Sequence, residues 1–123
     1  MKRIGIWLDD FRDPKALRHQ ELFKSYDTDE ILWAKGFDEF QDIINDIVKN
    51  PGDRVLHSVF FDNDLGDRFS REGRHAFTWL ENLIHEHELH RILLYAQTDN
   101  GAAKQELYRG FNALDRYWVS VGK

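Results

Sequence analysis

The sequence has no cysteine, only two prolines and a single methionine among its 123 residues. The lack of cysteine excludes a disulfide framework, a thiolate metal site and a thiol nucleophile, and it is typical of a reducing compartment. No apolar run approaches the roughly 20 residues that a membrane span needs. Residues 1–3 precede a short apolar run without the features of a signal peptide. We therefore expect a cytoplasmic protein that has no membrane partner.

The chain also lacks an excess of basic residues, since its net charge is -5. This charge argues against broad, charge-driven binding to nucleic acid. A small phosphorylated ligand is compatible with it, because a bound divalent cation reverses the local sign of the charge. The length fits one domain over residues 1–123, large enough to bury a complete hydrophobic core.

Short apolar runs alternate with helical patterns along the chain. Strands are predicted over residues 4–8, 30–34, 55–61 and 91–95, with residues 118–121 as a candidate fifth strand. Helices are predicted over residues 15–23, 38–48 and 74–89, and a last helix, capped by Asp99 or Asn100, includes Leu107, Phe111 and Leu114. We expect a single three-layer α/β domain with a mainly parallel sheet of four or five strands and helices on both faces. The preferred strand order is the flavodoxin-like 2-1-3-4-5, and the main variant omits the fifth strand.

Acidic residues follow two of the predicted strands. Asp9 and Asp10 come after the first strand, and Asp62 and Asp64 come after the third. Ligands of open α/β sheets bind outside the carboxyl ends of the strands, so these four carboxylates are predicted to share one crevice. They would repel one another without a proton or a hard cation between them. We expect all four to be ligands of Mg2+ or another divalent cation; the alternative is that they only cap helices and shape turns.

Three further polar residues are candidates for binding a phosphate. Arg12, in the first loop, is expected to bind it through its forked guanidinium, and the alternative is an ordinary surface ion pair with Asp13 or another acid. Gln97 and Thr98, just after the fourth predicted strand, are expected to donate hydrogen bonds to the same ligand. The arginines in the loop after Asp64 are expected to form a solvated surface.

The position of the acids resembles the response-regulator receiver domain. The resemblance implies that Asp9 and Asp10 hold Mg2+, that Asp62 accepts a phosphoryl group, and that the backbone carbonyl of Asp64 is a further metal ligand. The sequence departs from receivers at two later points. The fourth predicted strand ends without their Ser or Thr, and Lys123 is the only candidate for their lysine after a fifth strand.

A closer resemblance is to the cyclic-phosphate processing receiver-like domains of bacteria and their phages. Members typically carry Leu-Asp-Asp-x-Arg-x-Pro, and residues 8–14 read Leu-Asp-Asp-Phe-Arg-Asp-Pro. Members then carry Asp-His-Asp-Leu-Gly, and residues 62–66 read Asp-Asn-Asp-Leu-Gly. Asn63 thus replaces a histidine, and Tyr95 and Ala96 replace a His-Ser pair. The resemblance implies action on cyclic phosphates from RNA repair or NAD-linked pathways.

Our first hypothesis is therefore a Mg2+-dependent phosphohydrolase or phosphodiesterase that acts on a cyclic-phosphate nucleotide or sugar. Its candidate catalytic residues are Asp10, Asp62 and Asp64. The imidazoles that could shuttle protons near neutral pH are replaced, so a non-catalytic binding or regulatory module, for example a phage protein aimed at a host protein, is the alternative. A phosphoacceptor receiver domain is the third hypothesis.

Overall fold

Four parallel strands form the central sheet in a computed structural model, which describes residues 1–16 and 18–123. The strands are β1 (Lys2–Leu8), β2 (Glu30–Ala34), β3 (Arg54–Phe61) and β4 (Leu93–Ala96). Their order in the sheet is β2-β1-β3-β4, and each pair of neighbours is parallel. This arrangement confirms the predicted α/β fold in its four-stranded variant.

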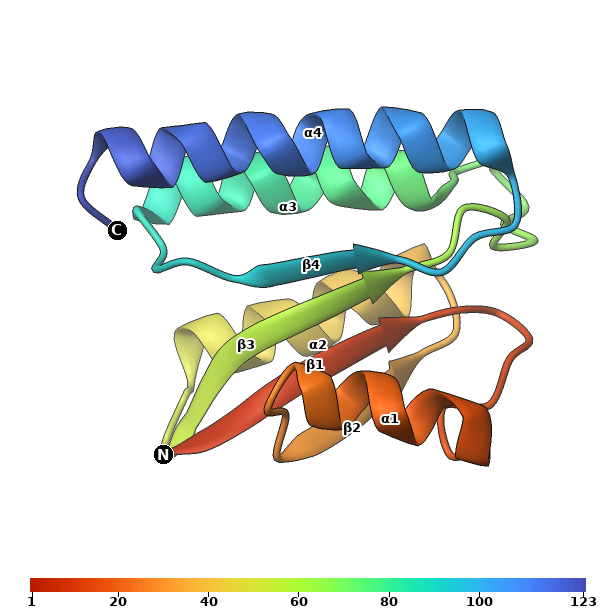
Figure 1. Ribbon diagram of the computed structural model, residues 1–123, viewed down its shortest axis with the longest axis horizontal. Helices are drawn as coiled ribbons and strands as arrows, with labels where there is room; N and C mark the ends of the chain where they lie inside the picture. The colour runs from red at the N-terminus through yellow and green to blue at the C-terminus, as the bar shows by residue number, and fades with distance from the viewer.

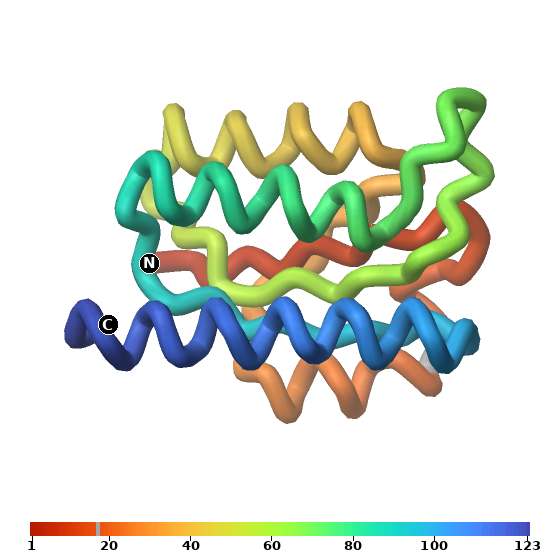
Figure 2. Tube along the Cα trace, turned by 90° about the horizontal axis from the view of Figure 1, so that it is seen from above, coloured from red at the N-terminus to blue at the C-terminus, as the bar shows by residue number. Residues whose placement is uncertain are grey.

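The four helices are α1 (Leu17–Ser25), α2 (Phe37–Lys49), α3 (Gly73–His87) and α4 (Gly101–Ser120). Helix α1 covers one face of the sheet, α2 and α3 cover the other, and α4 runs beside α3 along β4 (Figures 1 and 2). Helices on both faces confirm the predicted three layers. Within the part of the chain that the structure describes, no helix is long and apolar enough to cross a membrane.

Strand β1 is buried on both of its faces, as its continuous apolar sequence predicts. Ile4, Ile6 and Leu8 belong to the larger core, which α2, α3 and α4 complete. Trp7 points to the other face and packs with Phe23 and Phe60 beneath α1. The alternation of side chains along the strand therefore supplies both cores at once.

The helices carry the apolar stripes that the sequence predicts. In α2 and α3 the buried side chains recur at helical spacing, and they are Phe37, Phe40, Ile44, Ile47, Ala76, Phe77, Leu80, Leu83 and Ile84. Helix α4 begins after Asn100, whose Oδ1 accepts a hydrogen bond of 3.1 Å from the amide of Ala103. Of the two predicted caps, Asn100 is thus the correct one.

The candidate fifth strand over residues 118–121 is wrong. Helix α4 continues through this segment as far as Ser120. Trp118 lies four residues after Leu114 and extends the same buried stripe, with only 1% of its surface exposed. No glycine or proline separates the two residues, so the helix has no reason to stop before the indole is buried.

The carboxyl ends of the strands are aligned in the sheet. Leu8 pairs with Ala34 on β2 and with Phe61 on β3, and Phe61 pairs in turn with Ala96 on β4. The chain therefore leaves β1, β3 and β4 at one edge of the sheet. This register brings together the polar segments that follow these three strands.

Gly73, the first residue of α3, lies against the backbone at the end of β3. Its amide donates a hydrogen bond of 2.9 Å to the carbonyl of Asn63. A Cβ atom added at this position would lie 1.9 Å from the carbonyl oxygen of Asp62. Only glycine permits this approach, which closes the loop of residues 63–72 on itself.

We expect Gly73→Ala to destabilise the protein by about 3 kcal/mol, at the upper end of the range for overpacked sites. The added methyl group would have to displace backbone, which cannot rotate away as a side chain does. Urea unfolding followed by circular dichroism measures the change. Gly101→Ala is the matched control, because Gly101 also begins a helix and has no atom within 4 Å of an added Cβ. Equal stabilities of the two variants would contradict the prediction.

Candidate functional site

A cleft of about 220 Å³ opens at the carboxyl edge of the sheet. It is lined by residues that follow β1, β3 and β4, namely Asp9, Asp10, Phe11, Arg12, Asp62, Asp64, Thr98, Asp99 and Asn100. The four predicted acids, Arg12 and Thr98 are thus brought together. Gln97 is not, because its Nε2 donates to the carbonyl of Leu8 at 3.1 Å, and its side chain is not part of the lining.

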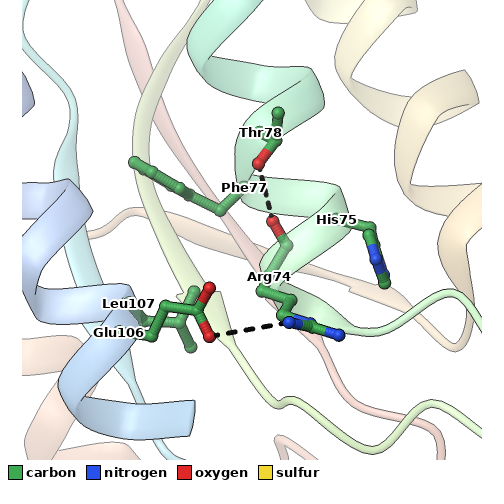
Figure 3. Close-up of a pocket in the computed structure, with 6 residues that line it drawn as sticks. All are labelled: Arg74, His75, Phe77, Thr78, Glu106 and Leu107. Carbon is green, nitrogen blue, oxygen red and sulfur yellow. Dashed lines mark hydrogen bonds and ion pairs between the residues drawn. The ribbon is translucent and has the colours of Figure 1, made fainter.

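A separate hollow of about 260 Å³ lies between α3 and α4 (Figure 3). Its polar side chains are largely paired with local groups. Arg74 lies 3.8 Å from Glu106 and also bonds Glu72, while Thr78 donates to the carbonyl of Arg74. Because it contains no cluster of acids and Arg74 is engaged there, we place the functional site in the cleft at the sheet edge.

Three carboxylates in the cleft lie close enough to share a cation. One oxygen from each of Asp9, Asp10 and Asp62 lies within 4.8 Å of the other two. Asp9 and Asp62 are buried and Asp10 is exposed. Two oxygens on one Mg2+ lie at most about 4.2 Å apart, so a small movement of these side chains would bring them to the distances of an ion that keeps several waters. Asp64 lies on the cleft wall, outside this cluster of three.

The loop that carries Asp9 is held by its own carboxylate. Oδ1 of Asp9 accepts hydrogen bonds from the amides of Phe11 and Arg12, at 3.0 and 2.8 Å. Such a turn leaves Oδ2 as the oxygen directed toward other groups. The Asp9 carboxylate therefore both shapes the loop and contributes to the acidic cluster.

Two indoles from the sheet hold the same loop from outside. Nε1 of Trp7 donates to the carbonyl of Arg12 at 2.9 Å, and Nε1 of Trp33 donates to the carbonyl of Asp9 at 2.7 Å. Both rings lie on the α1 side of the sheet. These tryptophans therefore do more than pack, because each also fixes a backbone carbonyl of the site.

Arg12 is the cation at the centre of the cleft. Its Nη1 lies 3.4 Å from Oδ2 of Asp9 and 3.8 Å from Oδ1 of Asp62, and it donates to the carbonyl of Gln97 at 3.2 Å. Its Nη2 donates to Asp99 at 2.7 Å. The Arg12 side chain is only 24% exposed. Arg12 thus contacts the acidic cluster, and it also forms the ion pair with a surface acid that was the alternative, with Asp99 in place of Asp13.

The family model for the cyclic-phosphate processing receiver domain matches residues 4–113. The chain belongs to this family. The match spans β1 to most of α4 and includes every residue that lines the cleft. Neither the curated proteins nor the solved structures contain a match to the chain.

Asn63, which stands where this receiver family typically has histidine, is turned toward α3. Its Nδ2 donates to Oε2 of Glu72 at 2.6 Å, and 1% of the residue is exposed. Its Oδ1 is buried without a hydrogen-bond partner among the described residues. The Asn63 side chain is not part of the cleft lining. In this receiver domain, residue 63 therefore supports the loop between Asp62 and Gly73.

Tyr95 and Ala96, at the positions of the family's His-Ser pair, do not line the cleft either. The ring of Tyr95 packs against Phe60 and Tyr26 on the α1 side of the sheet. Ala96 is fully buried in the larger core. Neither residue supplies a titratable group to the cleft, so the carboxylates are the side chains of its lining that could accept a proton.

The loop after Asp64 is held in place by an ion-pair network. Arg71 bonds Asp67 within the loop, at 2.8 Å, and Asp38 at the start of α2, at 2.9 Å. Its guanidinium also lies 4.5 Å from the centre of the Phe37 ring. Arg71 is thus a structural residue of the loop. It is engaged away from the cleft. The arginines of this loop were expected to form a solvated surface, and at Arg71 the ion pairs partly replace the solvent.

Three residues of the cleft were not identified as site residues from the sequence. Phe11 is 86% exposed between Asp10 and Arg12, and Asp99 and Asn100 follow Thr98 after β4. Asp99 and Asn100 were recognised only as candidate helix caps. The sequence signal available for Asp99 and Asn100 was their position after β4, which ends at the same edge of the sheet as β1 and β3.

Asp62 is the carboxylate of the cleft whose pKa the fold raises. Burial raises its pKa from 3.8 to about 6, and the negative charge of Asp9 adds to the rise. The amide of Asn63, which donates to Oδ1 at 2.9 Å, and the charge of Arg12 oppose it. Without a cation, ionised Asp62 is therefore unfavourable in the folded protein.

We expect Asp62→Asn to stabilise the metal-free protein more at high pH than at low pH. In the folded state Asp62 keeps its proton up to about pH 6, whereas in the unfolded chain it loses it near 3.8. The folded state therefore loses stability as the pH rises through this window, and the penalty is complete above it. The variant should gain about 2 kcal/mol more at roughly pH 7.5 than at roughly pH 4.5.

Urea unfolding of both proteins in EDTA, at the two pH values, measures this difference. The comparison cancels the contributions of other titrating groups, such as Asp29 and Asp67, whose pKa values are lowered by Arg3 and Arg71. A gain of the same size at both pH values would show that the Asp62 carboxylate is not destabilised by the fold.

Proposed function

We propose that the protein is a Mg2+-dependent phosphohydrolase or phosphodiesterase that opens a cyclic phosphate on a nucleotide or a sugar. The observation that carries the proposal is the cluster of Asp9, Asp10 and Asp62 beside Arg12 in one cleft. Membership in a family linked to cyclic-phosphate processing supports the same chemistry. The substrate is a small phosphorylated ligand, in keeping with a cleft of about 220 Å³.

Asp9, Asp10 and Asp62 would hold the divalent cation, and Asp64 on the cleft wall is a further candidate ligand. When bound, such an ion offsets the charge of the acids and polarises the phosphoryl oxygens. Arg12 would bind a non-bridging oxygen of the phosphate through its fork of N–H donors. Thr98, buried at the cleft, would donate its hydroxyl to the same group.

Hydrolysis of the ring adds one water to phosphorus and breaks one P–O ester bond. The water must lose a proton, and the departing oxygen must gain one. Asp64 is an exposed carboxylate on the cleft wall outside the cluster of three, so it is the candidate base that accepts the proton of the water. The departing oxygen takes a proton from solvent, which has open access to the cleft.

A second candidate function follows from Asn63 and Tyr95. Neither side chain is part of the cleft lining, so the protein has no imidazole or phenol there from the family's usual positions. A receiver-like binding or regulatory module would keep the acidic cluster and the phosphate ligands but not turnover, and its target could include a protein. Turnover and cation binding must therefore be measured separately.

The deciding experiment is hydrolysis of a panel of cyclic phosphates with and without Mg2+. The panel contains 2′,3′-cyclic nucleotides and ADP-ribose cyclic phosphate, and 31P NMR follows the opening of the ring. We expect turnover that requires Mg2+ and falls by at least about 100-fold in Asp62→Asn, the low end for loss of a catalytic carboxylate. Asp42→Asn, which neutralises an exposed acid on α2, should leave the rate unchanged.

If no member of the panel is hydrolysed, calorimetric titration with Mg2+ distinguishes the two candidate functions. A folded protein that binds Mg2+ but opens no member of the panel would support the binding module. A protein that neither turns over the panel nor binds Mg2+ at millimolar concentration would exclude both candidate functions, because both rely on the same carboxylates.

A further inference from the structure

The ion pair between Arg12 and Asp99 crosses the mouth of the cleft. Nη2 of Arg12 donates to Oδ2 of Asp99 at 2.7 Å. The two residues come from different loops, after β1 and after β4, and both line the cleft. We propose that Asp99 is a built-in competitor that occupies the anion-binding side of Arg12 and that the ligand's phosphate must displace. The proposal rests on the proposed function for the identity of this ligand.

The two nitrogens of the guanidinium face different surroundings. Nη1 points inward, toward Asp9, Asp62 and the carbonyl of Gln97. Nη2 points to Asp99, whose side chain is 92% exposed. The inward contacts hold the guanidinium in position, and the outward contact is made by a group that solvent surrounds. An entering anion would therefore meet Arg12 on the side that Asp99 occupies.

The backbone around Asp99 is held independently of this ion pair. The amide of Asn100 donates to Oγ1 of Thr98 at 3.2 Å, and Oδ1 of Asn100 caps α4. The Asp99 side chain can thus rotate into solvent without any change in the loop. An exposed pair of this kind contributes little stability, on the order of 1 kcal/mol or less, so displacement is easy.

Asp99 also adds negative charge to a cleft that already holds four carboxylates. Each unit of ligand charge is repelled by Asp99, so the effect of this residue grows with the charge of the ligand. A cyclic phosphodiester carries one negative charge, whereas the ring-opened monoester carries nearly two at neutral pH. Asp99 should therefore disfavour the product more strongly than the substrate and assist product release.

The test compares the affinities of wild type and Asp99→Asn for two probes that differ in charge. The probes are 2′,3′-cyclic AMP and 3′-AMP, titrated in Mg2+ at about pH 8, where the monoester is a dianion. Chemical shifts of the protein report binding, and 31P spectra of the same samples report whether the ring stays closed. Asp42→Asn is the control for loss of an acid outside the cleft.

We expect Asp99→Asn to bind 2′,3′-cyclic AMP about 3-fold more tightly and 3′-AMP about 10-fold more tightly, as removal of one charge at about 6 Å in water implies. The gain should shrink in high salt. It should also be smaller in an Arg12→Gln background, because Asp99 no longer competes for the guanidinium there and only its repulsion of the ligand remains.

Several results would overturn the proposal. Unchanged or weaker affinity in Asp99→Asn would mean that Asp99 does not compete with the ligand. An equal gain for both probes would remove the discrimination by charge. A gain of undiminished size in Arg12→Gln would show that Asp99 does not compete for Arg12. Failure of wild type and Asp99→Asn to bind either probe would exclude Arg12 as a phosphate ligand. Tighter binding without ring opening would leave the inference intact and reject only the proposed catalysis.

Discussion

Two buried carboxylates, Asp9 and Asp62, share the carboxyl edge of the sheet, and Arg12 is the fixed charge that makes this possible. Carboxylates in low-polarity surroundings repel each other and resist ionisation. The guanidinium lies within 4 Å of both. It compensates only in part, since the pKa of Asp62 is still raised to about 6. The cleft is thus short of positive charge, and a divalent cation fits this shortage in both charge and ligand type.

Much of the fold could be predicted from the sequence because local patterns and packing agree. The run at residues 4–8 is apolar at every position except Gly5, which fits a strand buried on both faces, and the stripes of α2 and α3 are regular. The last segment was ambiguous because Trp118 and Val119 favour both strands and buried helices. Its outcome depends on whether Trp118 is in phase with Leu114, which a helix satisfies.

The site could be predicted only in part. The position of the acids followed from the strands that precede them, because parallel strands end at one edge. The partners of each side chain did not follow, since they come from distant loops. Arg12 bonds Asp99, which lies 87 residues later, and Asn63 turns to Glu72 instead of the cleft. The partners of Gln97 are also distant in sequence. Its side chain faces the backbone of the sheet, because carbonyls of β1 and β3 lie within its reach.

The indoles of Trp7 and Trp33 make the shape of the first loop independent of most of its side chains. They bind carbonyls of Arg12 and Asp9, and the Asp9 carboxylate binds two amides of the same loop. Phe11 contributes no side-chain hydrogen bond to this arrangement among the described residues, and it is 86% exposed. This position can therefore vary during evolution without remodelling the backbone. A single rigid loop could in this way be adapted to different ligands by exchange of the side chain at position 11, while Asp10 stays in the acidic cluster.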